Sequence, residues 1–389
     1  MDRSAYLDAA AKHFRELVKE QIDRAENMKA GMNETTDFAS LDKIVIGVCD
    51  GDGIGPVIMR AARRVLNVLL ADAIAAGRIE LRDIEGLTIG NRLALGESVP
   101  KDTLAAIKEC NVLLKGPTTT PGGTTMESAN VTLRRELDLY ANVRPVAVPE
   151  EGIDWTFFRE NTEGEYVLGS RGFEVPDTLA FDFKVTTDEG TRRIARAAFD
   201  YAKKTGKTRV SIVTKANIMK KTDAKFSAIC HEVAEEYPGI EADDWYIDIM
   251  TANLVNPDIR NRFEVFVLPN LYGDIITDEA AQIGGGVGTA GSANIGGRYA
   301  MFEAIHGSAP RMVEEGIAEY ANPTSILRAC ELMLAHIGCN GEANRLRDAL
   351  RECCEEERRV VVTGNRDGAT CEEFAHYVIE KIRETDITA

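Results

Sequence analysis

The chain has 389 residues, which is beyond the size at which one hydrophobic core stops growing, so two packed lobes are expected and one small domain is excluded. Its 44% hydrophobic and 6% aromatic residues are typical of an α/β enzyme and exclude a disordered or fibrous chain. Its formal charge of −17 argues against binding to nucleic acid, because that affinity comes mainly from Lys and Arg that neutralise phosphates.

The first segment with a regular pattern is residues 4–31, where apolar residues recur at spacings of three and four among charged residues. This periodicity predicts an amphipathic helix, with Ser4 as its N-cap and an end near Gly31. The polar residues 33–40 predict a linker, and the helix is expected to pack against the body or a neighbouring subunit.

The remaining elements alternate between strands and helices. Residues 43–49 predict a strand, residues 50–56 a glycine turn, and residues 57–76 a helix. Further strands are predicted at 111–114, 209–214 and 263–268, each before a glycine-rich or polar turn. The alternation predicts an α/β fold with a largely parallel core.

The cysteines and the apolar runs bear on where the chain resides. The eight cysteines form no C-x-x-C pair, which fits reduced thiols in a cytoplasm, and a disulfide framework is not needed at this length. No apolar run reaches 18 residues, and the first 30 residues contain no signal peptide pattern. We therefore expect a cytoplasmic protein without a membrane span.

The glycine turn, G-D-G-I-G-P at 51–56, resembles a dinucleotide-binding loop but lacks its third glycine position. These glycines could equally serve a tight turn between strand and helix.

Three arginines, Arg134, Arg144 and Arg159, lie close to apolar residues in an acidic chain. A guanidinium near burial needs a carboxylate partner. That partner is either a protein group, with Glu136, Asp138 and Glu160 as candidates, or a substrate with several carboxylates.

Three acidic residues supply the complementary chemistry. Asp274 and Asp278 are four residues apart and would share one face of a helix, and Asp248 precedes them. Mg²⁺ and Mn²⁺ prefer such oxygen ligands. Acidic residues that favour a helix N-terminus are the alternative explanation.

A glycine-rich stretch at 284–297 and the following E-A-I-H-G-S-A-P at 303–310 predict a backbone-lined loop beside His306. Backbone amides in such a loop can approach a phosphate or an adenine.

Several of these segments together resemble the β-decarboxylating dehydrogenases, the family of isocitrate, isopropylmalate, homoisocitrate and tartrate dehydrogenases. The resemblance runs from about Lys43 to the C-terminus. Seven motifs carry it: GDGIGP at 51–56, LKGPTTTP at 114–121, SANVTLRRELDLYANVRP at 128–145, RENTEGEY at 159–166, TKANIMKKTD at 214–223, NLYGDIITD at 270–278 and HGSAP at 306–310.

The resemblance implies a fold of two lobes on an open mixed sheet, which is not a Rossmann fold. It implies a large domain of residues 41–139 and 284–389 and a small domain of residues 140–283 with a dimer clasp near 165–205, after an N-terminal helical extension, 1–40. It also implies a homodimer, or a higher oligomer built from it, whose active sites are shared between subunits.

Residue roles follow from the same resemblance. Tyr166 and Lys215 would be the proton-transfer pair, and Asp248, Asp274 and Asp278 the metal ligands, with Lys215 and Asp248 coming from the neighbouring subunit. Substrate would be bound by Ser128, Asn130, Thr120, Arg134, Arg144 and Arg159. The nicotinamide cofactor would be bound by Lys115, Thr119, Asn217, Glu303, His306, Gly307, Ser308, Ala309, Arg311 and Asn322.

The substrate is indicated by the pattern from Ser128 to Arg134. Isocitrate enzymes place S-x-N-x-x-x-R there to bind a γ-carboxylate, whereas isopropylmalate enzymes place apolar residues at the positions of Ser128 and Asn130. A site built from paired polar groups rejects an isopropyl group, since its donors would be left unpaired. The expected reaction is the oxidative decarboxylation of isocitrate to 2-oxoglutarate with Mg²⁺ or Mn²⁺.

The choice between NAD and NADP stays open. After HGSAP, NAD-linked relatives usually have an acidic residue and NADP-linked relatives a Lys-Tyr pair, whereas this chain has Arg311-Met312. An arginine can bind a 2′-phosphate, which favours NADP. The segment from Thr363 to Gly368 resembles the NAD-linked pattern instead.

Two other classes of protein remain alternatives. One is a homoisocitrate, isopropylmalate or tartrate dehydrogenase of the same family. The other is a noncatalytic regulatory subunit, against which the presence of the five catalytic and metal positions argues. Some relatives are phosphorylated at the position of Ser128, where a phosphate would repel the γ-carboxylate.

Overall fold

The computed structural model describes residues 3–31, 35–122, 126–169, 171–286 and 290–388. They form two compact units. Unit 1 is Met1–Glu34, Tyr140–Asn142 and Ala147–Glu279, and unit 2 is Thr35–Leu139, Val143–Val146 and Ala280–Ala389. The predicted α/β class, with a two-lobed mixed sheet and an N-terminal helix, is confirmed. The domain boundaries drawn from the sequence remain predictions.

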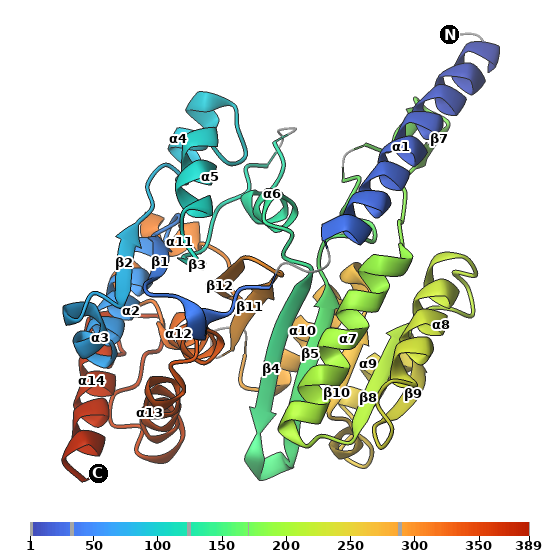
Figure 1. The fold of residues 1–389 in the computed structure, drawn as a ribbon. Helices are drawn as coiled ribbons and strands as arrows, with labels where there is room; N and C mark the ends of the chain where they lie inside the picture. Colours follow the sequence, from blue (N-terminus) through green and yellow to red (C-terminus); the bar gives the residue numbers. More distant parts are fainter. Residues whose placement is uncertain (1–2, 32–34, 123–125, 170, 287–289, 389) are drawn as a thin grey trace. The chain divides into compact units, whose positions relative to one another are not determined.

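Unit 2 is built on strands in the order β2-β1-β3-β12-β11 (Figure 1). Strand β1 pairs in parallel with β2 and β3, and β3 in parallel with β12, whereas β11 and β12 are antiparallel. Because both faces of the sheet are covered, the inner strands β1 and β3 are nearly continuous apolar runs, and every residue of β3 is buried, whereas the edge strand β2 is largely polar. The strands are β1 (Ile44–Cys49), β2 (Ile79–Asp83), β3 (Val112–Lys115), β11 (Gly291–Ile295) and β12 (Ala300–Ala304).

Helices cover both faces of this sheet. Helices α2, α12, α13 and α14 share one apolar core with it, and α5 and α6 share a second core. The helices of unit 2 are α2 (Gly55–Leu69), α3 (Ala71–Ala75), α4 (Ile89–Leu95), α5 (Lys101–Lys108), α6 (Ala129–Glu136), α11 (Pro310–Glu314), α12 (Thr324–His336), α13 (Asn340–Arg351), a π-helix (Glu352–Glu356) and α14 (Cys371–Thr388), with 3-10 turns at Phe38–Ser40 and Ala318–Tyr320.

Unit 1 has the strand order β4-β5-β10-β8-β9, and β10 pairs in parallel with both β5 and β8. Helices α7 and α8 lie on one face of these strands and α10 on the other (Figure 1). A separate hairpin is formed by β6 and β7. The elements are β4 (Ala141–Val148), β5 (Ile153–Glu160), β6 (Phe173–Val175), β7 (Leu179–Phe181), α7 (Asp188–Thr205), β8 (Arg209–Thr214), α8 (Thr222–Ala234), β9 (Glu241–Tyr246), α9 (Ile247–Leu254), β10 (Val265–Leu268) and α10 (Asn270–Ile283), with 3-10 turns at Pro149–Glu151 and Arg260–Arg262.

The predicted N-terminal helix is confirmed as α1 (Arg3–Gly31). Ser4 lies inside it, so the N-cap prediction is wrong. The helix belongs to unit 1, where Leu17 is 2% exposed and Glu20 forms a two-fold ion pair with Arg171 (2.6 and 2.9 Å). Its apolar stripe is only partly covered, because Phe14 is 54% exposed.

The predicted strands are confirmed within two residues as β1, β3, β8 and β10. The helix expected at 57–76 begins earlier, at Gly55, and Leu70 divides it into α2 and α3. None of the helices in the described ranges is both long enough and apolar enough to cross a membrane.

Candidate active site

The glycine turn of unit 2 is held against a second loop by its own backbone. Gly53 has φ +60, and a Cβ on it would lie 1.9 Å from the carbonyl oxygen of Ser308. The next amide, on Ile54, donates to that same oxygen at 3.0 Å. Glycine is required here for close approach of two loops, so the turn has a structural reason independent of any dinucleotide fingerprint.

Asp52 in this turn fixes the loop that carries the predicted pocket threonines. Its carboxylate accepts from the amides of Ile89 (2.7 Å) and Thr119 (2.9 Å). Fully buried Arg92 donates to the carbonyl of Thr119 at 2.9 Å and lies 3.8 Å from Asp52. Burial lowers the pKa of Arg92, and Asp52 opposes that effect. No role was predicted from the sequence for either Asp52 or Arg92.

A buried carboxylate in unit 2 joins two of the predicted site residues. Glu303 on β12 lies 3.1 Å from Nζ of Lys115 and 3.4 Å from Nη2 of Arg134, and Asn294 donates to it at 3.0 Å. Burial acts to raise the pKa of Glu303, but Lys115 and Arg134 outweigh it and lower the pKa to about 2. Predicted as a cofactor ligand, Glu303 is in this structure the counter-charge of two cations.

Arg134 retains unused hydrogen-bonding capacity. Its side chain is 10% exposed, and its buried Nε has no hydrogen-bond partner among the residues described. Ser128, the N-cap of α6, makes no side-chain capping bond, and Asn130 accepts from Thr118 at 3.3 Å. Buried donors without partners are costly, so Arg134 in the last turn of α6 is suited to an added acceptor such as a carboxylate.

Arg144 and Arg159 are also buried, but they lie on strands and not on α6. Arg144 is buried on the part of β4 that belongs to unit 2, and Arg159 is buried at the end of β5 in unit 1. Arg134 pairs with Glu303 and Arg159 with Asp274, and neither carboxylate was among the protein partners considered from the sequence. These partners come from distant parts of the chain, where sequence neighbours give no indication of them.

The predicted nucleotide residues of unit 2 cluster partly around residues 306–311. Thr119 and Ser308 share a hydrogen bond of 2.7 Å between their hydroxyls. Burial lowers the pKa of His306, and its buried Nε2 has no hydrogen-bond partner among the described residues. An unused ring nitrogen fits an added nucleotide group. Gly307 is exposed, and Ala309 has a left-handed φ of 43°.

The other residues predicted to bind the nucleotide or line the pocket are exposed or are hydrogen-bonded to other groups of the protein. Arg311 has an 85% exposed side chain, paired with Glu315 at 2.6 Å. The Asn322 side chain accepts from the amide of Thr324 at the start of α12. Thr120 and Asn217 are exposed, and Asn217 belongs to unit 1.

The glycine-rich stretch 284–297 is only partly a loop. Residues 287–289 lie outside the described residues, and 291–295 form the buried strand β11. The loop prediction is therefore wrong for 291–295. The strand pairs with β12, and Gly291 lets α12 approach, since a Cβ would lie 2.5 Å from the amide nitrogen of Ala329.

Unit 1 assembles a chain of contacts around Arg159. Its Nε and Nη2 donate to Oδ1 of Asn270 at 3.0 and 2.7 Å, and its Nη1 pairs with Asp274. Tyr166 donates its hydroxyl proton to Asp274 at 2.9 Å. Gly273 lets the arginine lie on α10, because a Cβ there would be 2.5 Å from Cγ of Arg159. One network thus contains three predicted residues and adds Asn270.

Lys215 and Asp248 form a second contact in unit 1. Nζ of Lys215 lies 2.5 Å from Oδ1 of Asp248, and the hydrogen bond to Lys215 is the main reason why the pKa of Asp248 lies below its ordinary value. The backbone amide of Lys215 donates to buried Asp223 at 2.7 Å. Asp223 thereby positions the lysine, a role that the sequence analysis did not assign.

The predicted metal ligands do not form a complete site within one chain. Asp274 and Asp278 lie one turn apart on α10, yet the described residues contain no group of three His, Cys, Asp or Glu side chains able to hold a metal ion. The two α10 carboxylates nonetheless fit part of an oxygen-ligand site for Mg²⁺ or Mn²⁺.

Comparisons with known proteins identify the family. Residues 45–378 match the family model described as isocitrate/isopropylmalate dehydrogenase. A Rickettsia bellii isocitrate dehydrogenase named for NADP is 38% identical over 87% of this chain and 69% of its own length. A 3-isopropylmalate dehydrogenase of Methanothermobacter thermautotrophicus is 38% identical over 80% of this chain and 91% of its own length.

A solved structure supports the same assignment. The isocitrate dehydrogenase of Methylococcus capsulatus superimposes with a TM-score of 0.77 at 37% identity, covering 87% of this chain and 99% of that one. The chain therefore belongs to the isocitrate/isopropylmalate dehydrogenase family of oxidoreductases.

Proposed function

We propose that the chain oxidises and decarboxylates isocitrate, yielding 2-oxoglutarate, CO₂ and reduced NAD or NADP. The observation that carries the proposal is that polar groups of α6 and its N-cap are left without hydrogen-bond partners among the residues described. Within the described part of the chain, Arg134 keeps a buried Nε without a hydrogen-bond partner, and the Ser128 hydroxyl does not cap the helix. A γ-carboxylate would satisfy these groups, whereas the isopropyl group of isopropylmalate would leave them unpaired.

The two malate-type carboxylates of isocitrate are assigned to Arg144 and Arg159 together with Arg134. Arginine suits this task because its planar fork binds a carboxylate through two parallel hydrogen bonds. Arg159 is held in place by Asn270 and Asp274 before substrate arrives. Such preorganisation lowers the entropy that binding must offset.

Proton transfer is assigned to Lys215 and Tyr166. Lys215, relayed by Asp248 or a water molecule, takes the proton of the C2 hydroxyl, and a bound nicotinamide would supply the acceptor for the hydride of C2. The resulting β-keto acid loses CO₂, and Tyr166 delivers a proton to C3 of the enolate. The hydrogen bond from Tyr166 to Asp274 orients its hydroxyl.

Mg²⁺ or Mn²⁺ would be held by Asp274 and Asp278, completed by Asp248 of a second copy. When bound, the ion supplies positive charge that favours loss of the hydroxyl proton and formation of the enolate. The sharing of Asp248 is the reason to propose a homodimer as the active form, and a cytoplasmic location is proposed from the thiol content alone.

The test is the initial rate of reduced-nicotinamide formation with Mg²⁺ or Mn²⁺, crossing isocitrate, isopropylmalate, homoisocitrate and tartrate with NAD and NADP. Turnover of isocitrate alone supports the proposal. Faster turnover of another substrate assigns the chain to that activity. No turnover with any pair, in protein that is folded by circular dichroism, favours a noncatalytic regulatory subunit.

A further inference from the structure

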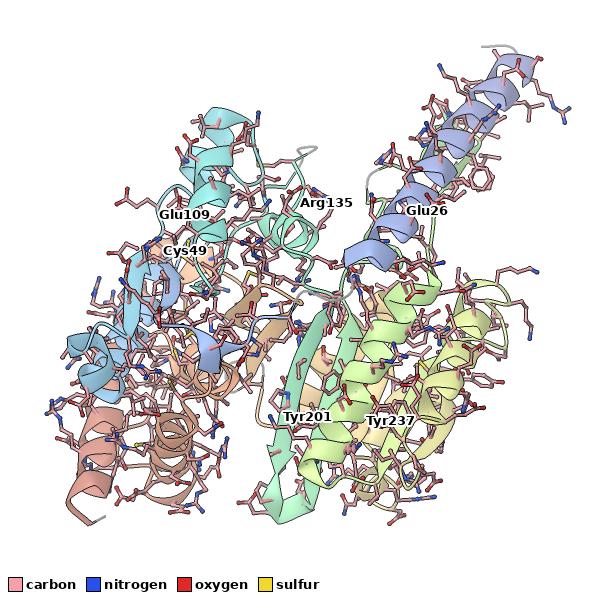
Figure 2. The ribbon with its side chains drawn as sticks, in the orientation of Figure 1. Glu26, Cys49, Glu109, Arg135, Tyr201 and Tyr237 are labelled. Atoms are coloured by element: carbon pink, nitrogen blue, oxygen red, sulfur yellow. The ribbon has the colours of Figure 1, made fainter. Side chains whose placement is uncertain are left out.

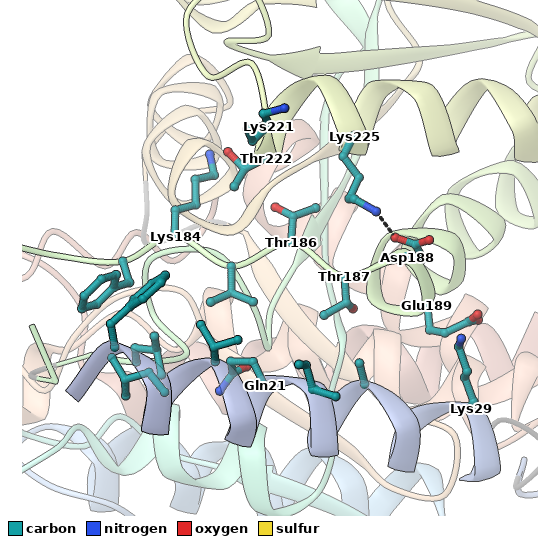
Figure 3. Close-up of a pocket in the computed structure, with 18 residues that line it drawn as sticks. Gln21, Lys29, Lys184, Thr186, Thr187, Asp188, Glu189, Lys221, Thr222 and Lys225 are labelled. Atoms are coloured by element: carbon teal, nitrogen blue, oxygen red, sulfur yellow. Dashed lines mark hydrogen bonds and ion pairs between the residues drawn. The ribbon is translucent and has the colours of Figure 1, made fainter. Parts of the chain in front are cut away.

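The N-terminal helix forms one wall of a pocket within unit 1 (Figure 3). The pocket lies between α1, the segment 183–189 and residues 221–225, and its volume is about 500 Å³. We call it the α1 pocket. This volume, with eight apolar side chains and several charged ones in the lining, is typical of small-molecule sites.

The α1 side of the pocket is an apolar stripe that the described residues of this chain leave partly exposed. Phe14, Val18 and Ile22 follow one another at four-residue spacing, and they are 54%, 39% and 53% exposed. Gln21, between them, keeps a buried Oε1 without a hydrogen-bond partner in the described part of the chain. The contiguous exposed apolar side chains mark a surface that can gain free energy by binding an apolar group, whereas the Gln21 oxygen is an acceptor and contributes nothing to binding an anion.

The wall is held in place at more than one point. Glu20 pairs with Arg171, and Arg24 donates to Glu163 at 3.2 Å and to the carbonyl of Thr162 at 3.2 Å. Arg24 and Glu163 are largely buried, so this contact is less screened by solvent than a surface pair. The pocket is therefore preformed and does not need to be ordered by its ligand.

The charge of the lining favours an anion. Four lysines and two acidic residues line the pocket, a formal charge of +2 in a chain whose formal charge is −17. Lys225 pairs with Asp188 and Lys184 with Asp223, whereas Lys221 forms no ion pair among the described residues. Lys221 directly precedes α8, whose N-terminus also favours negative charge.

Two sets of contacts join the pocket to the proposed catalytic residues. Lys184 lies 2.6 Å from Asp223, and Asp223 accepts from the amide of Lys215. Burial acts to lower the pKa of Lys184, but the bond to Asp223 raises it overall.

The second set begins at Thr187, whose amide donates to Glu163 at 2.9 Å. The carbonyl of Glu163 accepts from Asn270, the residue that holds Arg159. Two residues that line the pocket, Lys184 and Thr187, are therefore in direct contact with residues that support the proposed catalytic side chains.

We propose that the α1 pocket binds an amphipathic anion, with its apolar part on Phe14, Val18 and Ile22 and its anionic group at Lys221, and that binding changes the dehydrogenase rate. The proposed binding is argued from the pocket alone. The proposed change in rate rests on the proposed isocitrate activity.

The binding experiment uses the full chain and decanoate, below its micelle concentration, in isothermal titration calorimetry. We expect one decanoate per chain and no binding of decylammonium, which has the same tail and the opposite charge. Val18→Asp and Lys221→Glu each weaken decanoate binding at least about tenfold, since one charge-pair or buried contact of about 1.4 kcal/mol corresponds to that factor. Leu7→Asp is the matched control, since Leu7 is 63% exposed on α1 and does not line the pocket.

Three binding results would overturn the proposal. These are no heat with decanoate, equal binding of decylammonium, and unchanged decanoate affinity in both pocket variants. Sedimentation velocity adds a fourth. If decanoate does not bind and Val18→Asp converts a wild-type dimer into a monomer, the stripe is an interface between copies of this chain.

The rate experiment measures isocitrate turnover across the same decanoate concentrations. A change of at least about twofold, half complete at the calorimetric Kd and absent in Lys221→Glu, supports the coupling. Saturating decanoate without any change in rate overturns it. Stoichiometric binding by a folded chain that turns over none of the four substrates would refute the proposed function and leave the pocket assignment in place.

Discussion

Replacement of Glu303 by Gln tests whether this buried carboxylate of unit 2 stabilises the buried cations Lys115 and Arg134. Lys115 is fully buried and Arg134 nearly so, so the amide would leave two buried positive charges without a counter-charge. Loss of one partner from a buried ion pair typically costs about 3–5 kcal/mol. The pKa gives a similar figure, because lowering it from 4.5 to about 2 corresponds to about 3 kcal/mol at about 1.4 kcal/mol per pKa unit.

The assay is urea unfolding at pH 7, followed by far-ultraviolet circular dichroism, of wild type, Glu303→Gln and the control Glu319→Gln. Glu319 is an exposed residue of the same unit. We expect a lower unfolding midpoint for Glu303→Gln, equivalent to about 3 kcal/mol, and no change for the control. A loss below about 1 kcal/mol would refute the reasoning, since the cations would then be satisfied without the carboxylate.

The pH dependence of this difference has a defined sign. The folded-state pKa of Glu303 is depressed, so its stabilisation is fully present above the ordinary value of 4.5 and is lost as pH falls towards about 2. The difference between wild type and Glu303→Gln should therefore be constant from pH 7 down to about 5.5 and shrink below 4.5. A difference that grows in that lower range would contradict the assignment.

Three further predictions concern the proposed reaction. Gly273→Ala should raise KM for isocitrate at least about tenfold at unchanged fold, because its Cβ would displace Arg159. Gly90→Ala is the control and should leave KM unchanged, since Gly90 has open space around it. An unchanged KM in both variants would refute the contact between Gly273 and Arg159. Tyr166→Phe should lower kcat about 100- to 10,000-fold with little effect on KM, as expected for loss of a general acid, and a drop confined to KM would exclude that role. Arg311→Glu should raise KM for NADP more than KM for NAD if this exposed arginine meets a 2′-phosphate, and equal effects on both nucleotides would contradict that contact.

Local signals in the sequence were sufficient for much of the fold. Strand β8 lies within the predicted residues because a β-branched apolar run between polar turns has few other solutions. The N-terminal helix was predictable from its spacing, although its N-cap was not. The strand β11 was missed because its glycines indicated a loop, and only its pairing with β12 and the close approach of α12 make glycine suitable in a strand.

The candidate site divides in the same way. The motifs indicated which residue types carry the chemistry, and the structure joins Arg159, Tyr166 and Asp274 in one network of unit 1. The supporting residues Asp52, Asn270 and Asp223 were not assigned from the sequence, although each lies inside a quoted motif. The sequence does not show which groups they bind, because Asn270 accepts from Arg159 across 111 positions, and even Asp223, only eight positions from Lys215, meets its amide only in the folded chain.

The sequence by itself determined the family and the α/β class, and it predicted which residues bind a tricarboxylate and a divalent metal, because motifs and periodicity depend on short-range order. Only the tertiary structure decided the partners of those residues. Glu303 lies 188 positions after Lys115 and 169 after Arg134 and meets both because β12 pairs with β3 and α6 packs on the same sheet. Such contacts depend on strand order and burial, which bring charges together across the chain and make each unpaired one costly.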